Sequence, residues 1–331
     1  MIRKPTRRRA LALGFGAALA PTILPASAVR AQAWPTGPIT WLNPFPAGGG
    51  TDVFARPLAA EVADKIGQTI VVDNKGGAGG TVGASQAAKM KPDGSAFFVG
   101  AVHHTIAPSI YKNLDYDLEK NFEPITMIAL VPQVISIHPQ RVPVKTYAEF
   151  LDYVKKNPGK VNYASPGAGT AHHLAGELFK LETKTDITHV PYRGAGPAMQ
   201  DLLAGNVDMM FDGMGTSASQ IRVGRLIGLA VATPQRLPEF PNIPTGAEVG
   251  IPNWLVSSWY GLWGIKGTPQ PLLDRMYNEV AKALQTPKLM GIWKDQTAQA
   301  GGEKPAEFAK RIRAEIEKWA KVVQAAGVKL D

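Results

Sequence analysis

Cysteine is absent from the 331 residues of this chain. Its absence excludes disulfide bonds, thiolate metal sites and a cysteine nucleophile, so the fold has to be stabilised by core burial. The net charge of +9 overstates how basic the chain is after residue 33, because residues 1–33 contain six Lys or Arg and no acid. The remaining residues therefore carry +3, and they contain no basic run that would attract nucleic acid or an anionic membrane.

The motifs of several enzyme classes are missing as well. The glycines of residues 77–83 have the wrong spacing for a dinucleotide fingerprint, and no glycine loop ends in Lys-Ser or Lys-Thr. Ser165 lacks the glycine two residues earlier that a nucleophile elbow requires. No cluster of histidines and acids resembles a metal site. We therefore expect no catalytic residue, no metal and no cofactor, and a secreted enzyme is the least favoured function.

Residues 1–33 have the pattern of an export signal. Arg3, Lys4 and the run Arg7-Arg8-Arg9 form a basic start, residues 10–28 form an apolar run, and Ala31-Gln32-Ala33 is a small-x-small cleavage signal. Such a signal directs a protein out of the cytoplasm. The sequence thus predicts a periplasmic protein that begins near Trp34.

Two alternatives concern this segment. Thr6-Arg7-Arg8-Arg9-Ala10-Leu11 resembles a twin-arginine signal, which makes that export route an alternative to the general secretory route. A membrane anchor is the other alternative, but Pro21 and Pro25 interrupt the apolar run. The balance favours cleavage and export.

A glycine-rich loop joins the first apolar strand to a helix. Residues 38–43 read as the strand, and Thr51 or Asp52 is the expected N-cap of the helix, in which Pro57 predicts a kink or a late start. A helix start leaves about four backbone N–H groups unpaired and carries about half a positive charge, so it attracts anions. The loop residues expected to bind a ligand, with an aromatic wall from the first, are Phe45, Pro46, Ala47, Gly48 and Gly49.

The same arrangement recurs three times along the chain. The second loop follows a strand at residues 69–73 and contributes the candidates Gly77, Ala78, Gly79, Gly80 and Thr81. The third follows a strand at residues 161–164, opens a helix at 171–181 and contributes Ser165, Gly169 and Thr170. A fourth loop, residues 193–196, lies between a strand at 188–192 and a helix at 197–204. The repetition predicts several anion-binding helix starts.

Two charged side chains and two histidines lie near these loops. Arg193 is either a ligand-binding cation or a surface charge, and Asp212 either selects a ligand amine or hydroxyl or caps a turn. His172 and His173 lie about 100° apart on a helix, so they do not share a metal. One of the two histidines is expected at the mouth of a cleft, and His172 is included among the ligand candidates.

Strands that alternate with helices predict an α/β fold with largely parallel sheets, in which ligands bind beyond the carboxyl ends of the strands. A second domain is predicted to begin after the apolar run 125–137, near a capping box at residues 146–149, and the strand at 254–265 returns the chain to the first domain. Two helices, the first capped by Thr268, finish it. The predicted domains are 34–130 with 256–331, and 131–255, with a hinge around a cleft.

These segments resemble the Bug (TctC-type) family, the extracytoplasmic solute-binding proteins of tripartite tricarboxylate transporters. The resemblance covers nearly the whole chain after the export signal, and it is carried by residues 44–52, 72–80, 163–174, 189–194 and 201–208. It implies a type II periplasmic-binding-protein fold, in which two α/β domains close on a small di-, tri- or aromatic carboxylate. It also implies delivery of that carboxylate to the membrane components of the transporter, with presentation to a membrane sensor kinase as the alternative.

Overall fold

A computed structural model of the chain describes residues 34–328, and the predicted export signal lies outside the described residues. Residues 34–328 form one compact unit. None of the helices described in it combines the length and apolar character that a membrane span requires.

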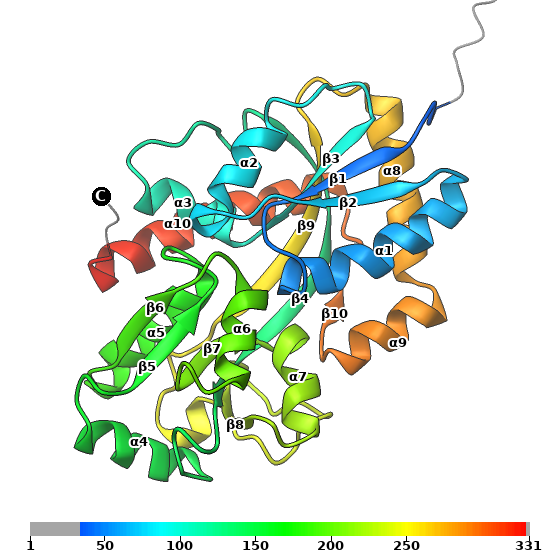
Figure 1. Cartoon of the computed structure of the whole chain (residues 1–331). Coiled ribbons are helices and arrows are strands. Elements are labelled where there is room, and N and C mark those ends of the chain that lie inside the picture. The colour runs from blue at the N-terminus through cyan, green and yellow to red at the C-terminus, as the bar shows by residue number, and fades with distance from the viewer. Residues whose placement is uncertain (1–33, 329–331) are drawn as a thin grey trace, which may run out of the picture. The chain divides into compact units, whose positions relative to one another are not determined.

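The described part of the chain contains α-helices, short 3₁₀ turns and strands in alternation (Figure 1). The strands are β1 (Ile39–Asn43), β2 (Ile70–Asn74), β3 (Ala96–Ala101), β4 (Phe122–Ile137), β5 (Asn162–Ser165), β6 (Thr188–Pro191), β7 (Met209–Gly213), β8 (Ile227–Val231), β9 (Ser257–Ile265) and β10 (Gln299–Ala300). The helices are α1 (Gly50–Ile66), α2 (Thr81–Ala87), α3 (His103–Ile110), α4 (Tyr147–Lys156), α5 (Ala171–Thr183), α6 (Ala195–Leu203), α7 (Met214–Arg222), α8 (Gln270–Leu284), α9 (Pro287–Asp295) and α10 (Pro305–Ala326). The 3₁₀ turns are η1 (Ala78–Gly80) and η2 (Ala247–Val249).

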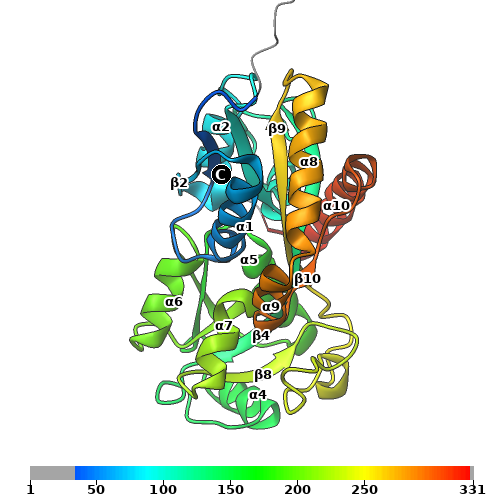
Figure 2. The ribbon, with the colours of Figure 1, turned by 90° about the vertical axis from the view of Figure 1, so that its right-hand side faces the viewer.

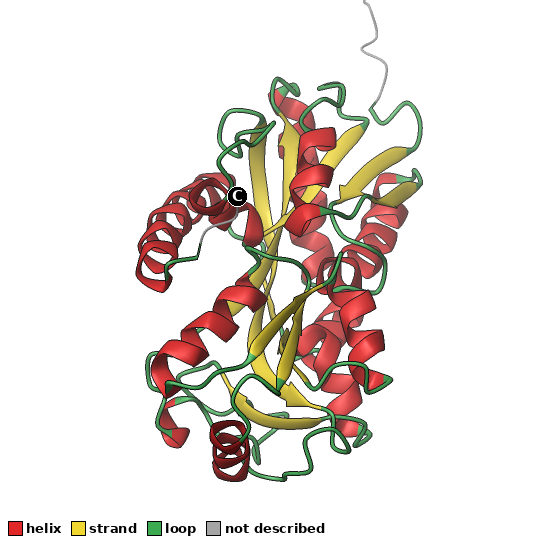
Figure 3. Ribbon diagram, turned by 60° about the vertical axis from the view of Figure 1, so that its left-hand side comes forward, coloured by secondary structure: helices red, strands yellow, loops and turns green. Residues whose placement is uncertain are grey.

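The strands form one sheet in the order β2-β1-β3-β9-β4-β7-β5-β6, with β8 and β10 also paired to β4 (Figure 3). β1 is parallel to β2 and β3, and β5 is parallel to β6 and β7. The antiparallel pair β4 and β9 joins these two parallel groups. The predicted α/β class is therefore confirmed. We refer to β1–β3 with α1–α3 as the first half, and to β5–β7 with α4–α7 as the second half.

The strand β4 extends through both halves. Its residues 122–132 pair with β9, and residues 133–137 pair with β7. The C-terminal helices return to the first half, where α8 packs against α1 (Figure 2) and α10 packs against α3 (Figure 1). The strand β3, sequence AFFVGA, is buried at every position, as expected for a strand covered on both faces.

Several local predictions can be compared with these elements. The capping box at Thr146 and Glu149 is confirmed. Helix α1 begins at Gly50 with Gly49 as its N-cap, so the prediction of Thr51 or Asp52 as N-cap was wrong. Of the two alternatives predicted for Pro57, a kink or a late start, the structure excludes the late start. Pro269 is the N-cap of α8, while the hydroxyl of Thr268 donates to the carbonyl of Ile265, so that prediction was wrong too.

Candidate functional site

Four loops that each open a helix form the candidate site. Loop 1 (residues 44–49) lies between β1 and α1, and loop 2 (75–80) lies between β2 and α2. Loop 3 (166–170) and loop 4 (192–194) occupy the same position before α5 and α6 in the second half. All four follow the carboxyl ends of parallel strands, which is where ligands bind in α/β sheets.

Each loop of the first half touches a loop of the second half. A Cβ placed on Gly196, in the first turn of α6, would lie 2.6 Å from the carbonyl oxygen of Ala47 in loop 1. A Cβ placed on Gly167, in loop 3, would lie 3.2 Å from the backbone nitrogen of Gly79 in loop 2. A side chain at Gly196 would clash with the carbonyl of loop 1, and one at Gly167 would crowd the backbone of loop 2. The glycines thus serve contact between the halves as well as turn geometry.

Backbone N–H groups of helix starts gather at these contacts. Within residues 34–328, the N-caps Gly49 of α1 and Gly194 of α6 provide no side-chain cap. The first two backbone N–H groups of each helix, in Gly50 and Thr51 of α1 and in Ala195 and Gly196 of α6, are therefore available to a bound anion. In α5 the hydroxyl of Thr170 caps the helix by accepting from the backbone N–H of His173. Helix starts from both halves therefore provide donors at the site.

Asp52 holds loop 1 in shape. Its carboxylate accepts hydrogen bonds from the backbone N–H of Gly48 at 3.0 Å, from Nε of Arg56 at 2.8 Å and from Nδ2 of Asn74 at 3.0 Å. Asn74 also donates to the carbonyl of Phe45 at 2.8 Å. Burial alone would raise the pKa of Asp52, but these hydrogen bonds outweigh it and lower the pKa. Asp52 is thus a structural brace of loop 1.

Phe45, the predicted aromatic wall of loop 1, packs against two histidines that were not predicted. Its buried ring meets the ring of His103 edge-on at 5.3 Å and that of His104 at 6.3 Å between centroids. Nδ1 of His104 lies 3.0 Å from the backbone of Ala101, and Nε2 lies 3.4 Å from the carbonyl oxygen of Gly80. Burial lowers the pKa of His104 to about 4. This neutral histidine connects the end of β3 to loop 2.

His103 reaches from the first half to the second. Its Nδ1 accepts a hydrogen bond of 3.1 Å from the backbone N–H of Ala171, the first residue of α5. Burial, together with the neighbouring His172 and His104, holds the pKa of His103 well below its ordinary value. Because Nδ1 accepts, the single proton of the neutral ring resides on Nε2. His103 therefore offers one N–H donor at the site.

Asp212 and His172 form a buried polar pair beside His103. The rings of His103 and His172 are 5.4 Å apart, and Nε2 of His172 lies 3.6 Å from Oδ1 of Asp212. Oδ2 of Asp212 accepts from the hydroxyls of Thr216 at 2.5 Å and Ser217 at 2.7 Å. Within residues 34–328, neither Oδ1 of Asp212 nor Nδ1 of His172 has a hydrogen-bond partner. The pair thus retains hydrogen-bonding capacity inside the protein.

The hydroxyls predicted in loop 3 are used within the loop. Oγ of Ser165 accepts from the backbone N–H of Gly167 at 3.1 Å and lies 2.6 Å from Nε2 of His189. Oγ1 of Thr170 donates to the carbonyl of Gly167 at 2.8 Å. The ring of His189 stacks on that of His173 at 4.0 Å. These side chains shape loop 3 and leave its backbone to face loop 2.

The prediction that one of His172 and His173 lies at a cleft mouth was wrong, because both are buried, with 2% and 7% of their surface exposed. Arg193 extends an exposed side chain from loop 4, and the hydroxyl of Thr81 donates to the carbonyl of Ala78 within loop 2. Within residues 34–328, no group of three or more histidines and acids is arranged to hold a metal ion. The remaining predicted ligand residues gather around the loop contacts: Phe45, Pro46, Ala47, Gly48, Gly49, Gly77, Ala78, Gly79, Gly80, Ser165, Gly169, Thr170, His172 and Asp212.

Sequence reasoning missed the contribution of His103 and His104. The signal was present, since both residues directly follow β3, and the rule that ligands bind beyond strand carboxyl ends applies there as well. They were overlooked because no glycine-rich segment follows this strand.

Several solved structures share this architecture. The structure of periplasmic binding protein BugD is 35% identical, with a TM-score of 0.86 over 90% of this chain and 100% of that one. Rpa4515 of R. palustris, solved with adipate, is 33% identical, with a TM-score of 0.86 over 90% and 100%. MatC of Rhodopseudomonas palustris, solved with bound malate, is 32% identical, with a TM-score of 0.83 over 88% and 100%. The fold and the loop site therefore define a periplasmic solute-binding protein.

The family follows from the sequence comparisons. The family model described as "Tripartite tricarboxylate transporter family receptor", TctC, matches residues 54–328, and the chain belongs to this family. Protein BugT of Bordetella pertussis is 34% identical over 307 residues, which are 92% of this chain and 94% of BugT. A protein of Pseudomonas sp. strain P51, described by its place between tcbD and tcbE, is 36% identical over 318 residues, 96% and 94% of the two chains. The predicted resemblance is thereby confirmed, and the family consists of solute-binding receptors.

Proposed function

We propose that this protein captures a small organic carboxylate between its two halves and delivers it to the membrane components of a tripartite tricarboxylate transporter. The observation that carries this proposal is the contact of helix-opening loops from both halves, loop 1 with the start of α6 and loop 2 with loop 3. The adipate and malate bound to Rpa4515 and MatC support a carboxylate as the ligand class.

The loops can bind a carboxylate although no lysine or arginine is buried among the described residues. Charge-assisted hydrogen bonds contribute about 1.5–3 kcal/mol each, so a few donors per carboxylate give useful affinity. The first-turn amides of α1 and α6 and Nε2–H of His103 are the proposed donors. Arg193 is proposed to attract the anion from the exposed edge of loop 4.

Closure of two domains would bring these donors together. The proposed domains comprise residues 34–130 with 256–331, and residues 131–255. Their boundaries fall on β4 and next to β9, the two strands that connect the halves. Bending of this antiparallel pair would move loop 1 away from loop 4 and loop 2 away from loop 3. The site would then be open and could admit the ligand.

Binding is tested by calorimetry and thermal shift with purified protein that begins at Trp34. The panel contains adipate, malate, citrate and benzoate, with adipamide as the matched control that lacks both carboxylates. We expect at least one acid to raise the melting temperature and adipamide to have no effect. Absence of a response to every acid would contradict the proposal.

Delivery and export need separate measurements. Deletion of the gene should abolish import of the bound carboxylate, while loss of transporter induction without loss of import would favour the sensor-kinase alternative. For export, replacing Arg7 and Arg8 with lysine should retain the protein in the cytoplasm if the twin-arginine route is used. Normal periplasmic recovery of that variant would indicate the general secretory route.

A further inference from the structure

Helix α3 is the element that connects the two halves at the loops. It directly follows β3 and packs against α10 (Figure 1). Hydrogen bonds place both of its ends close to loop 3. At its first residue, His103 accepts from the backbone N–H of Ala171, just after loop 3. This contact fastens only one end of the helix.

The other end of α3 is fastened by Tyr111, the C-cap residue of the helix. The hydroxyl of Tyr111 lies 3.1 Å from the carbonyl oxygen of Ala78, in loop 2, and 3.1 Å from that of Ala168, in loop 3. A Cβ placed on Gly169 would lie 3.4 Å from Cε2 of the Tyr111 ring. One hydroxyl therefore shares its proton between a carbonyl of each half.

The backbone around these two carbonyls is tightly packed. Ala78 has a positive φ of 44° within η1, and Gly79 next to it also has a positive φ. A Cβ placed on Gly79 would lie 3.0 Å from the carbonyl oxygen of Ala168 and 3.1 Å from the hydroxyl of Tyr111. The hydroxyl thus lies where loops 2 and 3 come closest, and separating the loops breaks its bond to at least one of them.

We propose that α3 is a closure clasp, and that Tyr111 is a positioning residue which stabilises the closed form by joining Ala78 of loop 2 to Ala168 of loop 3. This inference rests on the proposed function, since it assigns the residue that controls how long a carboxylate stays bound. Tyr111 binds the loops and leaves the anion to the helix starts. Its hydroxyl therefore affects opening and release more than the encounter with ligand.

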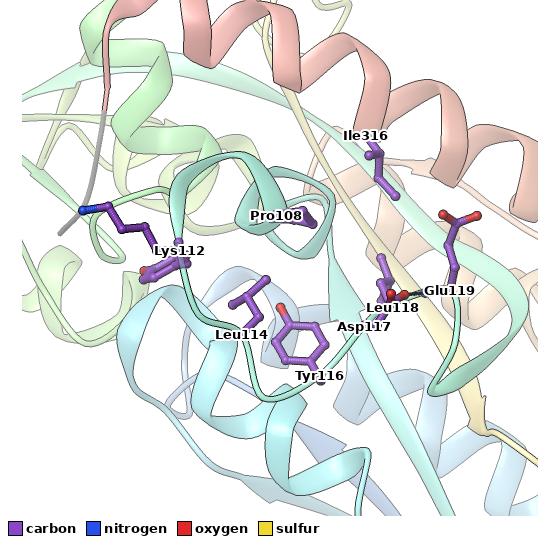
Figure 4. A pocket seen from close by; sticks show the side chains of 9 residues that line it. Pro108, Lys112, Leu114, Tyr116, Asp117, Leu118, Glu119 and Ile316 are labelled. Carbon is purple, nitrogen blue, oxygen red and sulfur yellow. Dashed lines mark hydrogen bonds between the residues drawn. The ribbon is translucent and has the colours of Figure 1, made fainter.

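The chain provides a matched control in Tyr116. Tyr111 and Tyr116 line the same pocket, of about 310 Å³. Figure 4 shows Tyr116 in this pocket together with Pro108, Leu114 and Ile316. The hydroxyl of Tyr116 is buried and has no hydrogen-bond partner within residues 34–328. Tyr111→Phe and Tyr116→Phe thus remove the same atom from neighbouring rings, and only the first removes a bond between loops.

The absence of cysteine allows closure to be measured directly. Asp64 of α1 and Lys156 of α4 are exposed and lie in different halves, so replacing both with cysteine gives a unique pair of sites for fluorescent dyes. Single-molecule energy transfer then reports the closed fraction without ligand and with saturating adipate or malate. Stopped-flow mixing gives the association and dissociation rates of the same two acids.

We expect Tyr111→Phe to decrease the ratio of closed to open protein about three- to tenfold, the effect of one hydrogen bond. Dissociation of adipate or malate should accelerate by the same factor, while association changes less than twofold. Tyr116→Phe should match the wild type in both measurements. Far-ultraviolet circular dichroism and melting temperature confirm that both variants fold.

Three results would overturn the clasp. The first is an equal closed fraction and equal release rate in Tyr111→Phe and the wild type. The second is an equal effect of Tyr116→Phe, which would indicate a general response of the pocket to a lost hydroxyl. The third applies if neither acid binds. The proposed function then fails for these acids, and the closed fraction of the ligand-free protein still tests whether Tyr111 stabilises the closed form. A wild type that is then entirely open would overturn it.

Discussion

Asp52 is the residue on which the shape of loop 1 depends most. Replacement with alanine leaves the N–H of Gly48 without an acceptor and removes one of the two acceptors of the Asn74 amide. Arg56, which is half exposed, contributes little through its charge. We expect Asp52→Ala to lower the free energy of unfolding by about 1–3 kcal/mol, because the buried amide of Asn43, which donates to Asp52 at 3.4 Å, also loses this acceptor. The variant should also weaken binding of whichever carboxylate responds in the panel.

Urea unfolding and calorimetry measure both effects. Asp64→Ala is the control, because Asp64 is an exposed acid in the same helix, and its replacement should change stability by less than about 0.5 kcal/mol. Equal losses of unfolding free energy in the two variants would show that Asp52 contributes no more than any other acidic residue of α1.

The residues of the site were predictable where backbone geometry demands glycine, and less so where side chains act through tertiary contacts. Loops 1 and 2 are visible in the sequence because positive φ and close approach both favour glycine, as at Gly79 and Gly80. Nothing local to Tyr111 indicates its role, because Ala168 lies 57 residues further along the chain. The position of His103 depends in the same way on Ala171.

At the scale of single elements, the capping box of α4 permits a prediction away from the site. Oγ1 of Thr146 accepts from the N–H of Glu149, whose carboxylate accepts from the N–H of Thr146 at 3.0 Å. Thr146→Ala should lower the free energy of unfolding by about 1 kcal/mol, since the first turn loses its side-chain acceptor. Affinity for carboxylates should be unchanged, because α4 lies apart from the four loops.

Thr146→Ser is the matched variant, because it keeps the hydroxyl and should restore most of the stability in urea titrations. If serine and alanine cost the same, the methyl group of Thr146 would be responsible, and the capping interpretation would be incorrect.

Elements with a strong local pattern were predicted, and those that depend on distant partners were missed. The apolar run at residues 125–137 became β4, and the amphipathic patterns became α8 and α10. By contrast, α3, α7 and α9 were not predicted. Helix α3 has the sequence HHTIAPSI, with Pro108 inside it and no side-chain cap, so packing against α10 determines it more than intrinsic propensity.

For the whole molecule, alternating strands and helices indicated two parallel groups, and both are present. The sequence did not reveal that they belong to one sheet, because this depends on the long-range pairing of β4 with β9 and β7. Register between distant strands has no local signature. The same pairing makes β4 and β9 the proposed hinge, and the domain boundaries predicted from the sequence fall on β4 and next to β9.

Buried histidines make the stability of the whole molecule depend on pH. Burial is the main cause of a lowered pKa in four histidines. The pKa of His104 falls to about 4 and that of His189 to about 3, and the pKa values of His103 and His173 are lowered as well. In the unfolded chain these histidines titrate near 6.5. As the pH falls below about 6.5, the unfolded chain therefore takes up protons before the folded protein does, and the free energy of unfolding decreases.

At pH 5 a histidine whose folded pKa lies well below 5 should have lost about 2 kcal/mol of stabilisation relative to pH 7. We expect the urea midpoint of the wild type to fall steadily from pH 7 to pH 5. In His189→Gln the slope of unfolding free energy against pH should be smaller by up to about 1.4 kcal/mol per pH unit, which is the effect of one proton. Glutamine can still donate to Ser165, so loop 3 should persist in the variant and isolate the titration. Stability that is constant over this range would contradict the burial of neutral histidines, whereas an unchanged slope in His189→Gln would assign the proton uptake to other histidines.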